Sequence, residues 1–309
     1  MIPDIAAKNG FSLDRLLTLC AVVDAGSIAL AAGPNPTRQS QFSRQIKELE
    51  EAFGRKLFIR EGKRLKATEL GEQLARMARS FFGAVDALAR QEAGRPETLA
   101  IGAGEAVLRW LLVPNFPMLR QLDPPIHSHA RGLATDEVVR EIALGRLDAG
   151  VIRIDAVPEG LAFESVGKLR YVLVVPRRLL LTRDAGEIHA GRRIPFVELS
   201  GGGQLTSLAA GVAREAGVVL DRVLLADTFS MLLAAVEHED VAAFLPTPAT
   251  AGLPGSRFAF PALNSIDRLT RELAVVWSPE AAEQRAVLKR GLAPLVRVLQ
   301  QALAAPSHQ

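Results

Sequence analysis

The chain has 309 residues, 49 % of them hydrophobic, and a formal net charge of +3. This length suits two or three domains, and no apolar run approaches the length of a bilayer span, so we expect no membrane partner. The N-terminus lacks the basic and then apolar order of a secretory signal, and the single Cys20 lies among leucines and valines, so we expect a cytoplasmic protein with a buried, unreactive thiol.

The positive charge is concentrated in one segment. Between Arg38 and Lys66, nine basic residues stand against four acidic ones. The resulting excess of five positive charges in this segment exceeds the net charge of +3 of the whole chain. A local excess of basic residues is typical of nucleic-acid binding. Without other supporting features, the same charge would be explained by an ordinary solvated surface.

Apolar periodicity and caps predict the first two helices. Phe11 to Asp24 has an amphipathic pattern, and Gly26 is expected to end that helix. Ser27 can cap a short helix through Ala32, after which Gly33-Pro34-Asn35-Pro36 breaks the chain. The expected buried stripe of the first helix is Leu13, Leu16, Leu17, Cys20 and Val23.

The stretch from Thr37 to Leu49 gives the strongest functional signal. As a helix it places Phe42, Ile46 and Leu49 in one apolar stripe. Its opposite face has no acid before Glu48 and carries Ser40, Gln41, Ser43, Arg44 and Lys47. Hydroxyl, amide and guanidinium groups can pair with base edges and phosphates in a major groove, so we predict a DNA-recognition helix.

A short basic hairpin is predicted after Gly54. Arg55 to Arg60 and Arg64 to Thr68 are expected to be strands joined by a turn. Three helices and this hairpin make a winged helix-turn-helix domain, predicted for residues 1–69. The hairpin residues expected to touch the DNA backbone or minor groove are Arg60, Lys63 and Arg64.

A linker helix is predicted next, over residues 70–93. Apolar residues recur at 70, 74, 77, 81, 84 and 88, and these alternating steps of four and three form a coiled-coil seam. The alternative is an ordinary helix that lies on its own domain. We prefer a dimerising helix, because two winged domains on a dyad can bind the two half-sites of a palindromic operator in double-stranded DNA.

The remainder, residues 94–309, has the pattern of an α/β domain. Gly94-Arg95-Pro96-Glu97 marks its start, and short apolar runs then alternate with helical periods. The expected strands are 99–103, 126–131, 149–154, 171–175, 195–199, 223–226 and 241–245. The expected helices are 106–122, 135–144, 205–216, 229–237 and a long final helix from 279 to 304.

Chemical motifs are weak in this α/β region. Gly102 and Gly104 open a helix, but the third glycine of a dinucleotide fingerprint is missing. His127 and His129 share a strand face without a Cys, Asp or Glu at ligand spacing, so we predict no metal site. Since no catalytic signature appears either, we expect neither an enzyme nor a cofactor.

The N-terminal block resembles the LysR-type transcriptional regulators. The matching motifs are Gly26-Ser27 before a short helix, Ser43-Arg44-Gln45-Ile46, the stretch from Leu49 to Phe58, and Thr68-x-x-Gly71. Two further segments, LAIGAGEAVLRWLLVPNFPMLRQL and EIALGRLDAGVI, match the family's effector domain more loosely. The chain departs from the family at Gly33-Pro34-Asn35-Pro36, which leaves the placement of residues 37–39 open.

The resemblance implies a periplasmic-binding-protein-like effector domain of two α/β lobes that hold a small molecule. Lobe I is expected at about 97–172 and 268–309, and lobe II at about 173–267. A homodimer or homotetramer is implied as well. The residues expected to line the effector site are Ala103, Gly104, Glu105, Thr135, Arg153, Gly203, Gln204, Leu205 and Thr228.

Several of these residues have two interpretations. Glu105 is either an exposed acid at a helix N-terminus or a ligand-facing group. The glycines before Gln204 either present amides to an anion such as a carboxylate or form a flexible turn. Arg153 can meet an acidic ligand or form a surface salt bridge.

The DNA-binding prediction covers the recognition helix, its flanks and the hairpin. Arg44 can span O6 and N7 of a guanine, whereas Ser27 and Lys47 are expected to contact phosphates. The full predicted set is Ser27, Arg38, Gln39, Ser40, Gln41, Ser43, Arg44, Lys47, Arg60, Lys63 and Arg64. The alternative function is a solute-binding or enzymatic α/β protein with a winged-helix interaction module.

Overall fold

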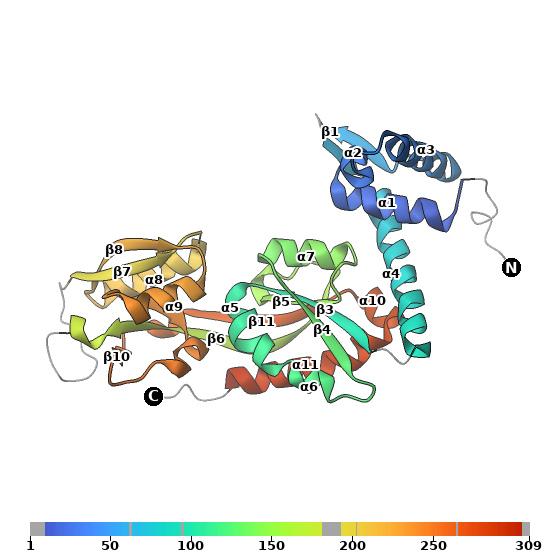
Figure 1. The fold of residues 1–309 in the computed structure, drawn as a ribbon. Coiled ribbons are helices and arrows are strands. Elements are labelled where there is room, and N and C mark those ends of the chain that lie inside the picture. The colour runs from blue at the N-terminus through green and yellow to red at the C-terminus, as the bar shows by residue number, and fades with distance from the viewer. Residues whose placement is uncertain are drawn as a thin grey trace.

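The computed structural model describes residues 10–61, 64–93, 96–180, 193–201, 203–263 and 265–304. A helical unit with a β-hairpin lies at one end of a long helix, and two α/β lobes extend from the other end (Figure 1). Within these ranges, no helix has both the length and the apolar character needed to cross a membrane. The predicted boundary at Gly94-Arg95 and the hairpin tip at Lys63 lie outside the described residues.

The N-terminal unit is the predicted winged helix-turn-helix. Ser12 and Ser27 cap its first two helices, and Gly26 and Gly54 end the first and third in the left-handed conformation. The core beneath the helices includes Leu19, Leu49 and Leu57, all fully buried. The elements are α1 (Leu13–Ala25), α2 (Ile28–Ala32), α3 (Pro36–Phe53), β1 (Phe58–Glu61) and β2 (Arg64–Ala67).

Two details of this unit correct the sequence prediction. Leu13 and Leu17 are 52 % and 51 % exposed, because the inner face of α1 is formed by Leu16, Leu19, Cys20 and Val22. The first hairpin strand begins at Phe58 rather than at residue 55, since the Glu50 carboxylate accepts hydrogen bonds from the amides that precede and begin the strand. Burial raises the pKa of the Cys20 thiol, which is consistent with a core residue.

The linker helix α4 (Glu69–Glu92) begins at a cap built by Thr68. The Thr68 hydroxyl donates to the Lys56 carbonyl and accepts from the Gly71 amide, at 3.0 and 3.1 Å. A Cβ at Gly71 would lie 2.2 Å from the Leu57 carbonyl oxygen, so the Thr-x-x-Gly motif is required where α4 crosses the hairpin.

The two halves of α4 have different surroundings. Its first half packs on the helix-turn-helix core through Leu74, Ala75 and Ala78. Met77 in the same half, and Phe81, Val85 and Leu88 farther along, are exposed by 48 % to 64 %. The start of the helix thus packs on its own domain, and the dimerising role of the exposed row stays a prediction.

Lobe I is a five-stranded sheet covered on both faces. Strands β4, β3 and β5 are parallel, whereas β11 runs antiparallel to its neighbours β5 and β6. Helix α7 lies on one face, and α6 and α11 lie on the other (Figure 1). The elements are β3 (Glu97–Ala103), α5 (Glu105–Val107), α6 (Pro117–Arg120), β4 (Ile126–Gly132), α7 (Thr135–Ala143), β5 (Ala149–Arg153), β6 (Ala162–Pro176), β11 (Thr270–Trp277), α10 (Pro279–Gln284) and α11 (Ala286–Ala304).

Lobe II is built around the far end of β6. This 15-residue strand pairs with β11 in lobe I and then with β9 and β10 in lobe II, so it connects the two lobes directly. The remaining elements are β7 (Arg193–Leu199), α8 (Gly203–Glu215), β8 (Val219–Ala226), α9 (Phe229–His238), β9 (Ala243–Pro246) and β10 (Phe258–Ala259).

Several predicted elements of the lobes have different bounds. The helix expected over 106–122 is broken into short α, π and 3-10 turns; Pro114 is the second residue of one piece and Pro117 begins another. The helix expected over 279–304 is interrupted at Arg285, whose guanidinium pairs with the buried Asp148. The sequence did not predict β10 or β11, and it predicted only the lobe II end of β6.

Candidate DNA interface and effector cleft

The exposed face of α3 carries the predicted DNA-contact groups. Ser40, Arg44 and Lys47 are all exposed, opposite the buried Phe42 and Ile46. The unusual turn before α3 is compatible with this arrangement. Asn35 accepts hydrogen bonds from the amides of residues 37 and 38, at 3.0 and 3.3 Å, and Pro36 occupies the first helical position.

Arg44 already has an intramolecular partner. Its Nε donates to Glu48 Oε1 at 2.7 Å, although the arginine side chain is 81 % exposed. Glu48 also accepts from Arg15 Nε in α1, at 2.8 Å. The hydrogen bonds from Arg15 and then Arg44 hold the pKa of Glu48 below its usual value. Lys47 Nζ lies 3.8 Å from a Glu51 carboxylate oxygen.

Two residues of the predicted DNA set have structural partners at the turns. Gln39 Nε2 donates to the Gly33 carbonyl at 3.0 Å, so this amide is directed to the preceding turn rather than outward. The Ser27 hydroxyl accepts from the Leu30 amide at 3.4 Å as the cap of α2. Of the three hairpin residues, Arg60 is exposed on β1. Lys63 and the side chain of Arg64 lie outside the part of the chain that the structure describes.

Glu50 is a positioning residue that the sequence did not reveal. One carboxylate oxygen accepts from the amides of Leu57 and Phe58 at 2.9 and 3.3 Å, and the other lies 2.7 Å from Lys56 Nζ. These bonds fix the hairpin against the end of α3. The one sequence feature that points to this role is an acidic residue near the helix end, eight positions before the strand begins.

A cavity of about 810 Å³ lies between the two lobes. The carboxyl ends of β3, β4 and β5 meet there, together with the N-termini of α5, α7, α8 and α9, which is where open α/β sheets bind ligands. Eight of the nine predicted effector residues line it: Gly104, Glu105, Thr135, Arg153, Gly203, Gln204, Leu205 and Thr228. The prediction for the ninth residue, Ala103, is wrong, because this residue is fully buried in the core of lobe I.

Two arginines of lobe I converge on one amide of lobe II. Arg153 Nη1 and Arg271 Nη1 donate to Gln204 Oε1, at 2.8 and 2.9 Å. Burial and the nearby charge of Arg153 lower the pKa of Arg271. Asp155 is the nearest acid to Arg153, at 3.6 Å. Two cations therefore share a neutral acceptor inside the cleft, an arrangement suited to an anion.

Arg271 is the main cleft residue that the sequence prediction missed. It lies on β11, a strand that was not predicted, so nothing connected it with Arg153 more than one hundred residues earlier. Tyr171 also lines the cleft, and burial raises the pKa of its phenol to about 12. This phenol is therefore neutral at physiological pH.

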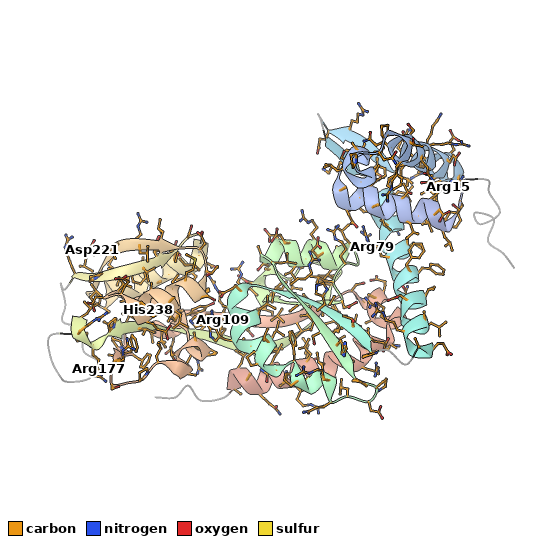
Figure 2. All side chains as sticks on the ribbon, viewed as in Figure 1. Arg15, Arg79, Arg109, Arg177, Asp221 and His238 are labelled. Carbon is orange, nitrogen blue, oxygen red and sulfur yellow. The ribbon has the colours of Figure 1, made fainter. Side chains whose placement is uncertain are left out.

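Glu105 connects the lobes. Its carboxylate accepts from the Phe229 amide at 3.1 Å and from the Ser230 hydroxyl, at the N-terminus of α9. Arg109, labelled between the lobes in Figure 2, also bonds to the Ser230 hydroxyl. The structure adds a further role for Glu105, in which the acid occupies the anion-favouring end of a helix in the opposite lobe, and its contact with a ligand stays a prediction.

Among the described residues, no group of three or more His, Cys, Asp or Glu is placed to hold a metal ion. His127 and His129 are both exposed on β4.

The structure combines a winged helix-turn-helix, a long helix and two lobes with a ligand-sized cleft. This combination is typical of ligand-responsive DNA-binding regulators. The family model of the LysR substrate binding domain matches residues 92–289, and that of the bacterial regulatory helix-turn-helix protein, lysR family, matches residues 13–72. The chain belongs to the LysR family of transcriptional regulators.

The sequence relatives are regulators too. A small neutral protease regulatory protein of Streptomyces coelicolor is 29 % identical over 195 residues, which are 60 % of this chain and 56 % of that protein. A probable nitrogen assimilation transcriptional activator of Synechococcus elongatus is 28 % identical over 144 residues, 45 % of this chain and 46 % of that protein. The chain spans about half the length of these curated relatives. The family and relatives are regulators, not enzymes.

Solved structures share the fold over nearly the whole chain. Full-length OxyR from Pseudomonas aeruginosa matches with a TM-score of 0.66 at 16 % identity, covering 97 % of this chain and 98 % of that one. LysG from Corynebacterium glutamicum with bound effector Arg matches at 0.62 and 20 % identity, covering 95 % and 98 %. Vibrio fischeri DarR in complex with DNA matches at 0.55 and 17 % identity, covering 93 % and 99 %.

Proposed function

We propose that this regulator binds an operator through α3 and the hairpin, and that a small anionic molecule in the interlobe cleft controls that binding. The observation that carries the effector half is the pair of arginines on Gln204 Oε1. The proposal divides the chain into a DNA-binding domain (residues 1–69), a linker helix (70–93) and an effector domain (94–309).

The DNA half of the proposal rests on the exposed groups of α3. The Glu48 carboxylate bonds to the Nε of Arg44, and an end-on arginine uses its two terminal nitrogens as donors to O6 and N7 of guanine. Ser40 lies one turn earlier on the same face. Ser27, Lys47 and Arg60 are assigned to phosphates, which position the protein without reading sequence.

The test of the DNA half uses fragments that the protein itself selects from a random duplex library. Arg44→Ala is expected to weaken binding to the selected site by about 1–3 kcal/mol, the range for one good base contact. The logarithm of the wild-type binding constant should fall linearly with the logarithm of salt concentration. Arg90→Ala, in a surface pair with Asp86 on α4, is the control. Unchanged affinity and site preference in Arg44→Ala would remove this residue from base recognition.

The effector half follows from the chemistry of the cleft. A carboxylate can take the place of Gln204 Oε1 or join it, and it gains charge-assisted hydrogen bonds from both arginines. Because Arg153 and Arg271 belong to lobe I and Gln204 to lobe II, a bound anion contacts both lobes. We infer that the ligand class is a small organic acid and that binding it biases the interlobe geometry.

The effector test compares acids with their uncharged amides in thermal-shift assays: benzoate, hexanoate and succinate against benzamide, hexanamide and succinamide. A ligand that binds only the folded state raises the melting temperature. At least one acid should do so, its amide should not, and Arg271→Gln should abolish the shift. Arg268→Gln, whose arginine pairs with Glu215, is the control. Equal shifts with acids and amides would exclude an anion site.

We also propose that the protein acts as a homodimer or homotetramer. The exposed residues Met77, Phe81, Val85 and Leu88 recur along one side of α4, and an apolar row of this kind on a long helix is typical of a helix-helix interface. Two copies would supply the paired winged domains that dyad-related half-sites require.

A further inference from the structure

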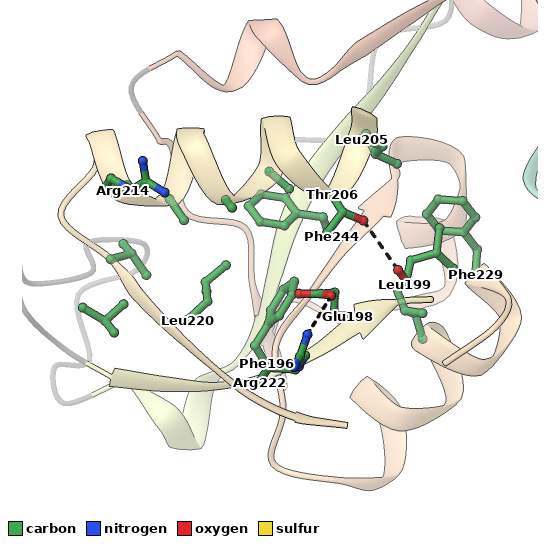
Figure 3. A pocket seen from close by; sticks show the side chains of 16 residues that line it. Phe196, Glu198, Leu199, Leu205, Thr206, Arg214, Leu220, Arg222, Phe229 and Phe244 are labelled. Carbon is green, nitrogen blue, oxygen red and sulfur yellow. Dashed lines mark hydrogen bonds and ion pairs between the residues drawn. The ribbon is translucent and has the colours of Figure 1, made fainter. Parts of the chain in front are cut away.

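Lobe II contains a second cavity, of about 300 Å³, between α8 and the β7–β8 strands (Figure 3). Small side chains of α8, at Ala209 and Ala213, face large ones on the strands opposite. The rings of Phe196 and Phe244, with centroids 5.9 Å apart, form part of the wall. The cavity is partly open to solvent, since the exposed residues Ala210 and Val219 line it, so α8 leaves part of the apolar wall uncovered.

This cavity adjoins the interlobe cleft. Leu199, Leu205 and Phe229 line both spaces and therefore form the partition between them. In Figure 3, Leu205 and Phe229 lie at one end of the cavity and Arg214 lies at the other. The partition is also next to the anion site, because Gln204 precedes Leu205 in the first turn of α8.

The chemistry changes across the partition. On the cleft side, Arg153 and Arg271 present donors at Gln204. On the lobe II side, the charged groups Glu198 and Arg222 satisfy each other in an ion pair of 3.2 Å. Apart from this pair, Thr206 and Arg214 at the far end are the polar members of the lining, and the rest of the surface is apolar. A molecule that uses both spaces must therefore have an anionic head and an apolar tail.

We propose that the effector is an amphipathic carboxylate, with its head on the two arginines and an aliphatic or aryl tail that passes Leu205 and Phe229 into the lobe II cavity. This inference rests on the proposed anion site in the cleft. The tail would pack between α8 and the sheet, so the ligand would fill lobe II as well as connect the lobes.

The test titrates the full-length protein with straight-chain acids from butanoate to decanoate in a calorimeter. Each methylene that enters the cavity should tighten Kd about fourfold, which is the burial of one CH₂ converted to affinity. The gain should stop once the cavity is full. The heat capacity of binding should become more negative over the same range, as expected for apolar burial.

Two matched variants of α8 locate the tail. Ala209→Leu places a larger side chain in the cavity and should flatten the chain-length series while leaving butanoate binding unchanged. Ser207→Leu makes a similar enlargement at an exposed position of the same helix and should leave the series intact. If Ala209→Leu does not fold, Ala210→Leu, at the exposed edge of the cavity, replaces it.

The outcomes separate this inference from the proposed function. Acids of every length that bind equally, and lose binding in Arg271→Gln, would overturn the tail site and leave the anion site standing. A length dependence that survives Ala209→Leu would also overturn the tail site. No binding by any of these acids, or binding unaffected by Arg271→Gln, would count against both.

Discussion

Glu48 is a single residue that serves both the stability and the binding face of the helix-turn-helix. Its carboxylate holds Arg15 of α1 and Arg44 of α3. The pairing neutralises part of the charge on the groove face of α3, while it orients the guanidinium before DNA is bound. For the base contact proposed for Arg44, the bond from its Nε to Glu48 would restrict the side chain beforehand and so reduce the entropy lost on binding.

Individual site residues could be predicted only where local sequence determines their position. The exposure of Ser40, Arg44 and Lys47 follows from helical periodicity around a buried stripe. The role of Glu105 did not follow, because its partners Phe229 and Ser230 are more than one hundred residues away in the chain. Long-range pairing of this kind leaves no periodic signal in one sequence.

The buried carboxylate of Glu141 provides a pH-dependent prediction at the residue scale. Burial alone would raise its pKa, but hydrogen bonds from Arg146 and then Arg131 more than offset this and lower it. A lowered native pKa gives stability that is present above the unfolded value, about 4.3, and is lost as the pH falls through the native value. Glu141→Gln should therefore lower the free energy of unfolding at pH 7 by about 1.5–3 kcal/mol.

Urea denaturation between pH 7 and pH 3 measures this effect. The difference between the wild type and Glu141→Gln should be largest at neutral pH and shrink below pH 4. The exposed Glu283→Gln should show no comparable difference. A Glu141→Gln penalty that is constant over the whole range would mean that the carboxylate charge is not its source.

At the scale of elements, caps and periodicity located most helices, but the sheet was only partly predictable. Gly26, Ser27 and Gly54 set helix ends in the positions expected of them. Strand β6 mixes exposed and buried residues in its lobe I half and lacks a long apolar run there. Strand β11 does contain an apolar run, over residues 273–277, but the prediction overlooked it. The missed strand also concealed the second arginine of the cleft.

A junction at Arg79 of α4 joins elements of the DNA-binding and effector regions (Figure 2). Its guanidinium donates to the Leu144 carbonyl of lobe I at 2.6 Å and to the Cys20 carbonyl of α1 at 3.3 Å. It also pairs with Asp24 at 2.5 Å, and Asp24 pairs with Arg146 of lobe I as well. Helix α1 is therefore tied to lobe I through α4.

Arg79→Met should loosen both sides of this junction together. Hydrogen–deuterium exchange is expected to rise at the end of α1 and in the turn after α7, since both lose a hydrogen-bond donor. Exchange in α9 of lobe II should not change. Arg90→Met, which removes a pair within α4 alone, is the matched control. Faster exchange confined to α1 would show that Arg79 does not connect it with lobe I.

On the scale of the whole molecule, the DNA-contact face and the cleft are far apart in the chain but share one route of connection. The cleft lies between the lobes, lobe I meets α1 through Arg79 and Arg146, and α4 carries the exposed apolar row at its other side. A change in interlobe geometry can thus reach the winged domain through lobe I, either by way of Arg79 on α4 or by way of the direct pair between Arg146 and Asp24 of α1. If α4 also pairs with a second copy, that change would alter the spacing of two winged domains.

The exposed row on α4 leads to a prediction about assembly and DNA binding together. Phe81 is 48 % exposed within this row. Phe81→Asp places a charge in the proposed helix-helix interface, where burying it without a partner is unfavourable, so the protein should dissociate toward monomers. Analytical ultracentrifugation measures the change in mass.

Binding to a two-half-site operator should weaken strongly, whereas the affinity for a single half-site should be retained, because α3 and the hairpin are untouched. Asp86→Asn, on the same helix, controls for altered charge. A Phe81→Asp protein that keeps the wild-type mass would place the assembly interface elsewhere.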